Sequence, residues 1–409
     1  MRIASVFLVL ILVLGIRAFL EYQNRQDLKD GEEVNFVTQI KSQPKISGSR
    51  QIVSANLDLN RILIITSPHP EFNYQDRIRV SGKLKVGVLN KNEIFILSFP
   101  KIQKIEDENS IFKFISVLRQ KLIYLFERTL PSDYSSLLLG IAFGIRRNMS
   151  SEFLDNLRIA GVLHVIAASG MNITLFGGFI GGVFSFFLKR QIALFLTVSG
   201  VLFYAVLSGF EASIVRATIM GILALSAQIL GRQRLSFYAL MVAGYLMIFI
   251  NPLTIFDIGF QLSFAATFGL LSIRPFFFFS DTIKKALNIT LIGEDLIITL
   301  SAQAATLPIL IANFGTYSIW SVFVNALVLW TVPILMVIGA VGGSLGIFWE
   351  LAGKAVILLA FPLIFYFDKI VSLFSDLGGS LEIEDFPWQF AAGYYLILVS
   401  LVLKFKNKL

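Results

Sequence analysis

The chain contains no cysteine and only two histidines, His69 and His164, among its 409 residues. The absence of cysteine excludes disulfides, thiolate nucleophiles and cysteine-ligated metals, and two histidines leave little for a histidine-based metal site. We therefore expect no metal and no cofactor. The chain also lacks a glycine-rich phosphate loop ending in Lys-Ser or Lys-Thr, so it cannot hydrolyse ATP by that route.

Charged residues are scarce as well, at 15%, whereas 56% of the residues are hydrophobic and 39 are phenylalanine. This balance lies well outside that of soluble domains and predicts an α-helical polytopic membrane protein. The net charge of +8 means that the basic residues gather in loops and in whatever soluble part exists.

The N-terminal region, residues 1–27, contains one apolar stretch over residues 3–20. Its length is near the minimum that crosses a bilayer. No small-x-small cleavage site follows, and Arg17 lies late in the stretch, so we expect an uncleaved transmembrane anchor rather than a signal peptide.

Residues 28–107 change to a period of two. Short alternating runs are separated by turn residues; the runs are VNFVTQI, RQIVSANLDL, RILIITS, DRIRVSGKLKV and EIFILSF. Five short strands need closure to bury one core, so this pattern predicts a small inserted β-barrel of the OB type.

This β-domain is mildly basic, with eleven Lys or Arg against seven Asp or Glu from Gly31 to Glu106. One interpretation is a solvated barrel surface. The other is a surface that follows a nucleic-acid backbone, with Phe72, Tyr74 and Phe95 as platforms on which bases stack.

The remaining region, residues 108–409, opens with a basic amphipathic helix over residues 111–130. We expect this helix to lie in the membrane interface, with reception of a polyanion as the alternative. Residues 135–145, SSLLLGIAFGI, are too few to span comfortably and predict a half helix or an interfacial element.

Nine longer apolar segments follow, near residues 161–188, 191–208, 213–230, 235–250, 255–273, 289–312, 317–345, 352–375 and 388–405. Together with the anchor they predict about ten transmembrane spans.

The loops between these segments alternate in charge. If the N-terminus lies inside, the loops at 189–190, 231–234, 274–285, 354 and 404–408 fall inside and carry Lys or Arg, whereas those at 251–252, 313–318 and 376–385 fall outside and carry none. This is the bias of multi-pass proteins. We therefore expect both termini on the cytoplasmic side and the β-domain outside.

One group of basic residues breaks the alternation, because it falls on the outer side beside the β-domain. Its members considered as a basic collar are Arg119, Lys121, Arg128, Arg146 and Arg147. Long translocated segments escape the rule. A basic collar on the outer mouth is nevertheless what a protein that receives an anionic polymer would need.

Polar residues inside the apolar segments are the functional candidates, because the bilayer makes them costly. They are Glu211, Arg216, Asp257, Gln261, Gln303 and Asn325. Asp257 and Gln261 lie four residues apart and could face the same cavity. Each residue could instead make a structural bond between helices, but several on different helices indicate a polar interior.

The stretch GVLHVIAASGMNIT, residues 161–174, interrupts an apolar run with His164, Ser169, Gly170 and Asn172. A Ser-His catalytic pair needs the two side chains within about 3 Å. His164 precedes Ser169 by five residues and would lie on another helical face, so an intramembrane serine protease is the least favoured interpretation. Ser169 and Gly170 would allow a break or a close helix contact.

Four motifs in fixed order carry a resemblance: LLLGIAFGI with the 161–174 stretch, LSGFEASIVRATIM, NPLTIFDIGFQLSFAATFGL and AQAATLPILIANFGTYSIWSVFVNALVL. They resemble the core membrane domain of the ComEC competence family, the channel for DNA uptake in natural transformation. The resemblance implies passage of single-stranded DNA through the bacterial cytoplasmic membrane. We expect no enzymatic activity from this chain. The β-domain is similar to that family's extracytoplasmic OB-like domain.

The chain also departs from this family. Asn172 stands where the family commonly has a second histidine, whereas His164, Ser169 and Gly170 match. Many members end in a metallo-β-lactamase-like domain, and no His-x-His-x-Asp-His run follows the last apolar segment here. The resemblance therefore implies that a separate nuclease removes the second DNA strand.

The alternative function is secondary transport of a small anionic substrate, because interrupted helices and midplane polar groups are typical of transporters too. The lack of an internal repeat favours the channel. Entry of DNA into a negative interior is electrically uphill. We therefore expect a passive conduit in the lipid bilayer, driven by a cytoplasmic ATPase or helicase or by the proton gradient. We also expect a separate DNA receptor, and the conduit could act alone or as a homo-oligomer.

Overall fold

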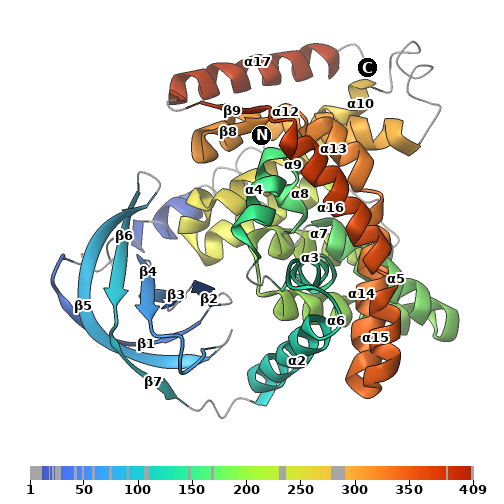
Figure 1. The fold of residues 1–409 in the computed structure, drawn as a ribbon. Helices are drawn as coiled ribbons and strands as arrows, with labels where there is room; N and C mark the ends of the chain where they lie inside the picture. The colour runs from blue at the N-terminus through green and yellow to red at the C-terminus, as the bar shows by residue number, and fades with distance from the viewer. Residues whose placement is uncertain are drawn as a thin grey trace.

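The computed structural model describes residues 12–406, apart from residues 18, 21–22, 24–28, 41–43, 48–49, 58–59, 73–75, 90–91, 106–109, 146–148, 167–169, 230–235, 278–290 and 384–385. A curved β-sheet comes first in the chain and a larger helical part follows (Figure 1). Of the expected N-terminal anchor, residues 12–17, 19–20 and 23 are described and are helical. The rest of the anchor lies outside the described residues.

Each of the five expected alternating runs forms a strand. The strands of the sheet are β1 (Glu33–Gln39), β2 (Lys45–Ser47), β3 (Arg50–Leu57), β4 (Asn60–Thr66), β5 (Arg77–Leu89), β6 (Asn92–Ser98) and β7 (Lys101–Ile105). The order is β1-β5-β6-β4-β3-β2, with β7 also paired to β5. The β4–β6 pair is parallel and the other pairs are antiparallel. The sheet curves into half a barrel (Figure 1).

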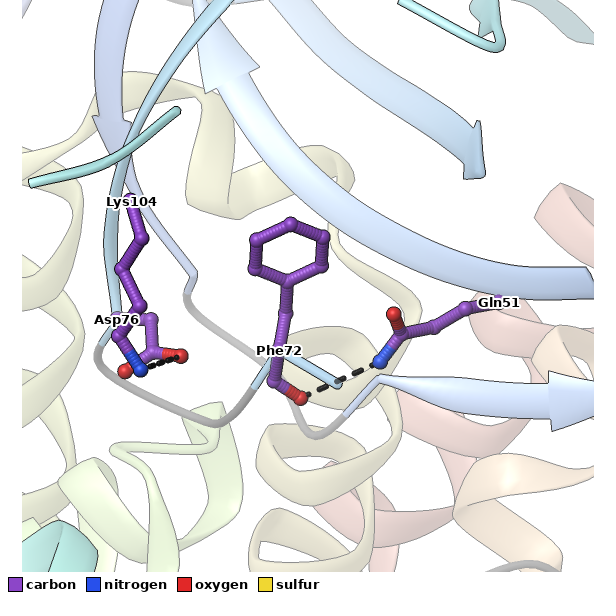
Figure 2. Close-up of polar contacts among 4 residues, drawn as sticks. All are labelled: Gln51, Phe72, Asp76 and Lys104. Carbon is purple, nitrogen blue, oxygen red and sulfur yellow. Dashed lines mark hydrogen bonds and ion pairs between the residues drawn. The ribbon is translucent and has the colours of Figure 1, made fainter. Parts of the chain in front are cut away.

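The inner face of this sheet encloses its own apolar core. The core consists of Val34, Ile40, Val53, Ala55, Ile62, Ile64, Phe72, Ile78, Val80, Leu84 and Leu97. Phe72 is therefore not the base-stacking platform that the sequence suggested, because its ring is buried while its carbonyl accepts a bond from Gln51 Nε2 at 3.3 Å (Figure 2). Phe95 packs half-buried against the same core. Tyr74 lies outside the described residues.

The helical part accounts for most of the chain. Its elements are α2 (Ser110–Glu127), α3 (Ser132–Phe143), α4 (Ser151–Ile159), η1 (Leu163–Val165), α5 (Gly170–Phe187), α6 (Arg190–Ser208), α7 (Ala212–Ile229), α8 (Ser236–Ile250), η2 (Pro252–Phe256), α9 (Ile258–Ser272), α10 (Arg274–Phe277), α12 (Leu291–Phe314), β8 (Thr316–Ser318), α13 (Ser321–Val328), α14 (Thr331–Phe348), α15 (Glu350–Leu358), α16 (Phe361–Asp376), β9 (Ser380–Glu382) and α17 (Trp388–Lys406).

Five helical segments of the described residues are long and apolar enough to cross a membrane: 163–187, 190–208, 296–314, 331–348 and 350–376. Four shorter apolar helices, within α7, α8, α9 and α17, accompany them. The protein is therefore a membrane protein. The described residues contain fewer helices of spanning length than the ten spans that the sequence predicts.

The expected span over residues 317–345 is divided. Strand β8 and helix α13 come first, and α14 then starts at Thr331. Pro333 consequently lies in the first turn of α14, where a missing N–H costs no helical bond. Its position marks a helix start rather than a disturbance within a span.

The amphipathic helix α2 uses its apolar face inside the protein. Ile115, Leu122 and Phe126 are buried, and the Phe126 ring meets Phe143 of α3 edge-on at 6.0 Å between centroids. The residues of α3 from Ser135 onward are buried too. The apolar face of α2 therefore packs on α3 and α14, and α3 is a short buried helix, in keeping with the expected half helix.

Glycines bring α14 and α15 together. A side chain on Gly353 would put its Cβ 2.3 Å from the Cα of Gly346, so the two backbones touch directly. Small residues allow such close helix contacts in membrane proteins.

A two-stranded ribbon ties distant helix ends. Strand β8 pairs antiparallel with β9, with Tyr317 opposite Leu381. Trp320 Nε1 also donates to the Gly378 carbonyl at 2.7 Å. The segments that follow α12 and α16 therefore meet at one end of the helical part.

Candidate functional site

The stretch from Gly161 to Asn172 connects two polar sites of the helical part. Gly161 lies against Ser321, and Gly170 lies against Arg216. The short 3-10 turn η1 precedes α5, so the apolar run is interrupted as expected. His164 lies in η1 with its side chain exposed. Ser169 lies outside the described residues.

Gly161 begins this stretch and has to be glycine. Its φ of +76° lies in the left-handed region. A Cβ at this position would also lie 2.6 Å from Ser321 Cβ and 2.9 Å from Ser318 Cβ. The chain thus passes directly over α13 and the end of β8.

A polar cluster forms around Ser321, on α13. Gln303 Nε2 donates to Ser321 Oγ at 2.6 Å, and Asn325 Nδ2 approaches the same oxygen at 3.4 Å. Ser321 Oγ in turn donates to the Gly161 carbonyl at 3.3 Å, and the Tyr317 hydroxyl donates to Gln303 Oε1 at 3.2 Å. We call these five residues the Ser321 cluster. It joins the two amide side chains that the sequence put on separate helices.

Neither Ser321 nor Tyr317 was a candidate from the sequence. Serine and tyrosine are common in apolar segments, and only the fold shows that both converge on Gln303. Asn325 Oδ1 is buried and has no protein partner in the described part of the chain, so the cluster retains hydrogen-bonding capacity.

Arg216, on α7, lies at the other end of the stretch. Its side chain is 8% exposed, and Nη1 donates to the Ser263 carbonyl of α9 at 2.9 Å. A Cβ on Gly170 would lie 2.6 Å from Nη2, so the guanidinium occupies the space of the absent side chain. The ion pairs seen among the described residues do not include Arg216. A positive charge is thus held between three helices.

Comparison with known families decides the identity of this helical part. Residues 141–408, more than half of the chain, match the family model described as Competence protein. The chain belongs to the competence protein family. Over 244 residues, 59% of this competence protein, it is 30% identical to ComE operon protein 3 of Bacillus subtilis (strain 168). The match covers 30% of that relative, so the chain spans less than a third of its length. No solved structure matches.

Asn172 of this competence protein serves a structural bond. Its side chain is buried, and Nδ2 donates to the Ile141 carbonyl of α3 at 3.0 Å. The fully buried Tyr204 lies beside it and packs on Phe176 with ring centroids 4.8 Å apart. Asn172 therefore links α5 to the central helix α3.

Asp257 and Gln261 do not face a common cavity. Asp257 precedes α9 as its N-cap, and its Oδ1 accepts from Phe260 N at 2.8 Å. Gln261 Nε2 donates to the Ile255 carbonyl at 2.9 Å. Both side chains therefore stabilise the η2–α9 junction. Asp257 lies just outside the helix, as an N-cap does, and so does not share a helical face with Gln261.

The basic collar loses one of its members. Arg119 is 4% exposed, and its Nη1 donates to the Leu207 carbonyl at the end of α6. Lys121 and Arg128 are exposed, and the Arg128 guanidinium stacks over Tyr124 at 5.1 Å. Arg146 and Arg147 lie outside the described residues.

A carboxylate that the sequence reasoning missed lies in α16. Asp368 Oδ2 accepts from the Tyr134 hydroxyl of α3 at 2.9 Å. Burial, helped by this bond, raises the pKa of Tyr134 to about 12, so the phenol stays a donor. The signal was available, because an acidic residue in the apolar run FYFDKIV is a candidate by the same rule as Glu211.

The β-domain carries a stripe of cations. Alternate residues of a strand point to one face, and the exposed residues of β5 on that face include Arg77, Arg79, Lys83 and Lys85. Lys101 of β7 pairs opposite Ser81 and extends the stripe. We call these five residues the β5 stripe.

Phe99 is an exposed aromatic residue next to the β5 stripe. It directly precedes Pro100 and Lys101, is 60% exposed, and has a φ of +50°. A bulky residue rarely adopts this backbone conformation. Within the described residues, no three His, Asp or Glu side chains gather as a metal site.

Proposed function

We propose that this competence protein conducts single-stranded DNA across the bacterial cytoplasmic membrane during natural transformation. The observation that carries the proposal is the family match over residues 141–408. The helical part is the conduit, and the β-domain is its receiving module. The chain acts as a channel and not as an enzyme.

The β-domain is an OB-like barrel in this proposal. The strand order and the single parallel pair, β4–β6, support this. Strands β1 and β2 are consecutive in the chain but lie at opposite ends of the strand order, as expected when a sheet closes toward a barrel. Such a barrel binds single strands with a basic groove and aromatic platforms, and the β5 stripe and Phe99 supply both.

The β-domain faces outward and both termini face the cytoplasm. Pairing of β8 with β9 supports this topology, because both strands lie in loops that the charge bias assigns to the outside. In Figure 1 the large sheet lies at the left and the β8–β9 ribbon lies left of centre beneath α17, whereas α10, from a segment assigned to the inside, lies at the upper right.

DNA passes the junction between the Ser321 cluster and Arg216. Neutral amides and hydroxyls can contact a polyanion without trapping it, and one buried cation lowers the barrier for phosphates. A separate cytoplasmic ATPase or helicase supplies the driving force, and a separate receptor and a separate nuclease deliver the strand.

A deletion of the gene tests the proposal. Cells without it should lose uptake of labelled DNA into a nuclease-resistant form, and the wild-type gene should restore it. Arg216→Ala should lower uptake at unchanged abundance of the protein, whereas Lys189→Gln, at an exposed cation between α5 and α6, should leave uptake intact. Unchanged uptake in the deletion would refute the proposal, and loss of small-anion transport instead would favour a transporter.

A further inference from the structure

Pro308 removes a backbone donor from the middle of α12. A proline has no N–H, so the carbonyl four residues earlier, that of Ala304, loses its helical partner. The Tyr394 hydroxyl of α17 donates to this carbonyl at 2.7 Å, and the Tyr395 hydroxyl donates to the Ala305 carbonyl at 2.9 Å. Two adjacent tyrosines thus serve two adjacent carbonyls where the helix ladder is interrupted.

Among the described residues, the surroundings of these bonds are largely apolar. A cavity of about 240 Å³ adjoins Ala305 and Tyr395, and its other lining residues are apolar side chains of α8, α9 and α17. On another side α9 packs directly on α12, because a Cβ on Gly269 would lie 2.4 Å from the Ser301 carbonyl oxygen. Unsatisfied carbonyls are costly in such surroundings. The Tyr394 phenol therefore supplies the donor that the Ala304 carbonyl lost to Pro308, and the Tyr395 phenol adds a second bond between α17 and α12 one residue on.

The same turn carries Gln303. Gln303 directly precedes Ala304, and its amide makes the bonds to Ser321 and Tyr317 that organise the Ser321 cluster. A shift of this turn would therefore move the Gln303 amide away from Ser321.

We propose that Tyr394 and Tyr395 are positioning residues that clamp α12 at Pro308 and so hold Gln303 in the Ser321 cluster. They act through α12 and touch no DNA. The clamp itself is independent of what the protein transports, while its consequence for uptake rests on the proposed function.

Spin labels measure the clamp directly in the full-length protein, because the chain has no cysteine of its own. Leu300→Cys and Phe314→Cys place labels at exposed positions of α12 on either side of Pro308, about 21 Å apart along the helix. We expect one narrow distance distribution in the parent and a broader one after Tyr394→Phe with Tyr395→Phe. Tyr245→Phe is the matched control, because the hydroxyl of this α8 tyrosine makes no bond among the described residues. An unchanged distribution in the double variant overturns the clamp.

Pro308→Ala sharpens this test, because alanine at position 308 restores the N–H that bonds the Ala304 carbonyl in a regular helix. In that background Tyr394→Phe should cost less thermal stability than in the parent, and the label distribution should no longer respond to it. An equal loss of stability in both backgrounds would show that the Tyr394 hydroxyl does not replace the proline's missing donor.

Uptake of labelled DNA tests the positioning of Gln303. Tyr394→Phe should lower uptake about fivefold, the effect of one lost hydrogen bond, at unchanged abundance. Gln303→Ala should lower uptake too, and adding Tyr394→Phe to it should change nothing further. A full additional loss in the Gln303→Ala background would overturn the positioning role. If deletion of the gene leaves uptake unchanged, the proposed function fails, and the label distances still decide the clamp.

Discussion

The β-domain and the helical part treat the same residue types in opposite ways. The β-domain buries its apolar residues and exposes its cations along the β5 stripe. The helical part buries Arg119 and Arg216, and it exposes large apolar side chains such as Phe348, at 91%. An exposed phenylalanine would be a liability in water but is neutral in a lipid environment. The β-domain therefore has the surface of a protein in water, and the helical part has the surface of a protein in lipid.

The largest effect that would break this comparison comes from helix packing. Gly353→Val should prevent folding, because a Cβ there overlaps the backbone of Gly346, and overpacking alone costs about 3 kcal/mol. Fluorescence-detected size-exclusion chromatography should show loss of the monodisperse peak. Gly178→Val is the control, since no atom lies within 4 Å of a Cβ at Gly178. A normal peak for Gly353→Val would contradict the close contact of α14 and α15.

A matched pair of arginine substitutions tests the two solvents directly. Phe179 of α5 is 50% exposed and Val86 of β5 is 41% exposed. Phe179→Arg should cost about 3 kcal/mol of membrane insertion, whereas Val86→Arg should be tolerated in water. Carbonate extraction of membranes measures insertion of both variants. Equal behaviour would mean that α5 does not face lipid at this position.

An aromatic pair sharpens the comparison for DNA. Phe99→Ala should weaken binding of a single-stranded oligonucleotide by about 2 kcal/mol, the value of one stacked base. Phe348→Ala, at the more exposed ring of the helical part, should leave the affinity unchanged. Fluorescence anisotropy with the detergent-purified chain gives both affinities. The role of Phe99 would be refuted by equal affinities of the parent and Phe99→Ala.

The smallest effect concerns salt. Lys83→Gln with Lys85→Gln should flatten the plot of log affinity against log salt by about 0.7 per lysine, because each lysine releases counterions from one phosphate contact. The exposed ion pair of Lys83 with Glu33, at 3.8 Å, is too weak to prevent this. Lys189→Gln, at an exposed cation between α5 and α6, serves as the control, and a slope that falls equally there would remove the special role of the β5 stripe.

The strands of the β-domain were predictable because their side chains alternate. Strands β2 and β7 were not predicted. They have three and five residues, which are too few for an alternation of period two to be recognised. In the helical part the apolar segments were found, but their division was not. Pro333 and Pro362 were signals of helix starts at α14 and α16, and length alone does not distinguish a start from a disturbance within a span.

The candidate site was predictable as a set of residues but not as a set of contacts. Gln303 and Asn325 stood out because amides in apolar helices are costly, whereas their meeting at Ser321 depends on how α12 packs beside α13. Arg119 was predicted to belong to an exposed basic collar but is buried. A helical wheel cannot show that a long side chain reaches the carbonyl at the end of another helix. Asp257 was misread because an N-cap and an in-helix residue look alike in sequence.

The β8–β9 ribbon has a consequence for cooperativity. Its strands have only three residues each, and the side chains of β9 are exposed, so packing contributes little to it. By joining Ser318 to Ser380 it brings together the two ends of the segment that contains α13 to α16. The conformational entropy of closing this segment is lost in a single step, when the ribbon forms. Helices α13 to α16 should consequently open and close as one unit, and the amides of this small ribbon should exchange hydrogen at the rate of the whole unit.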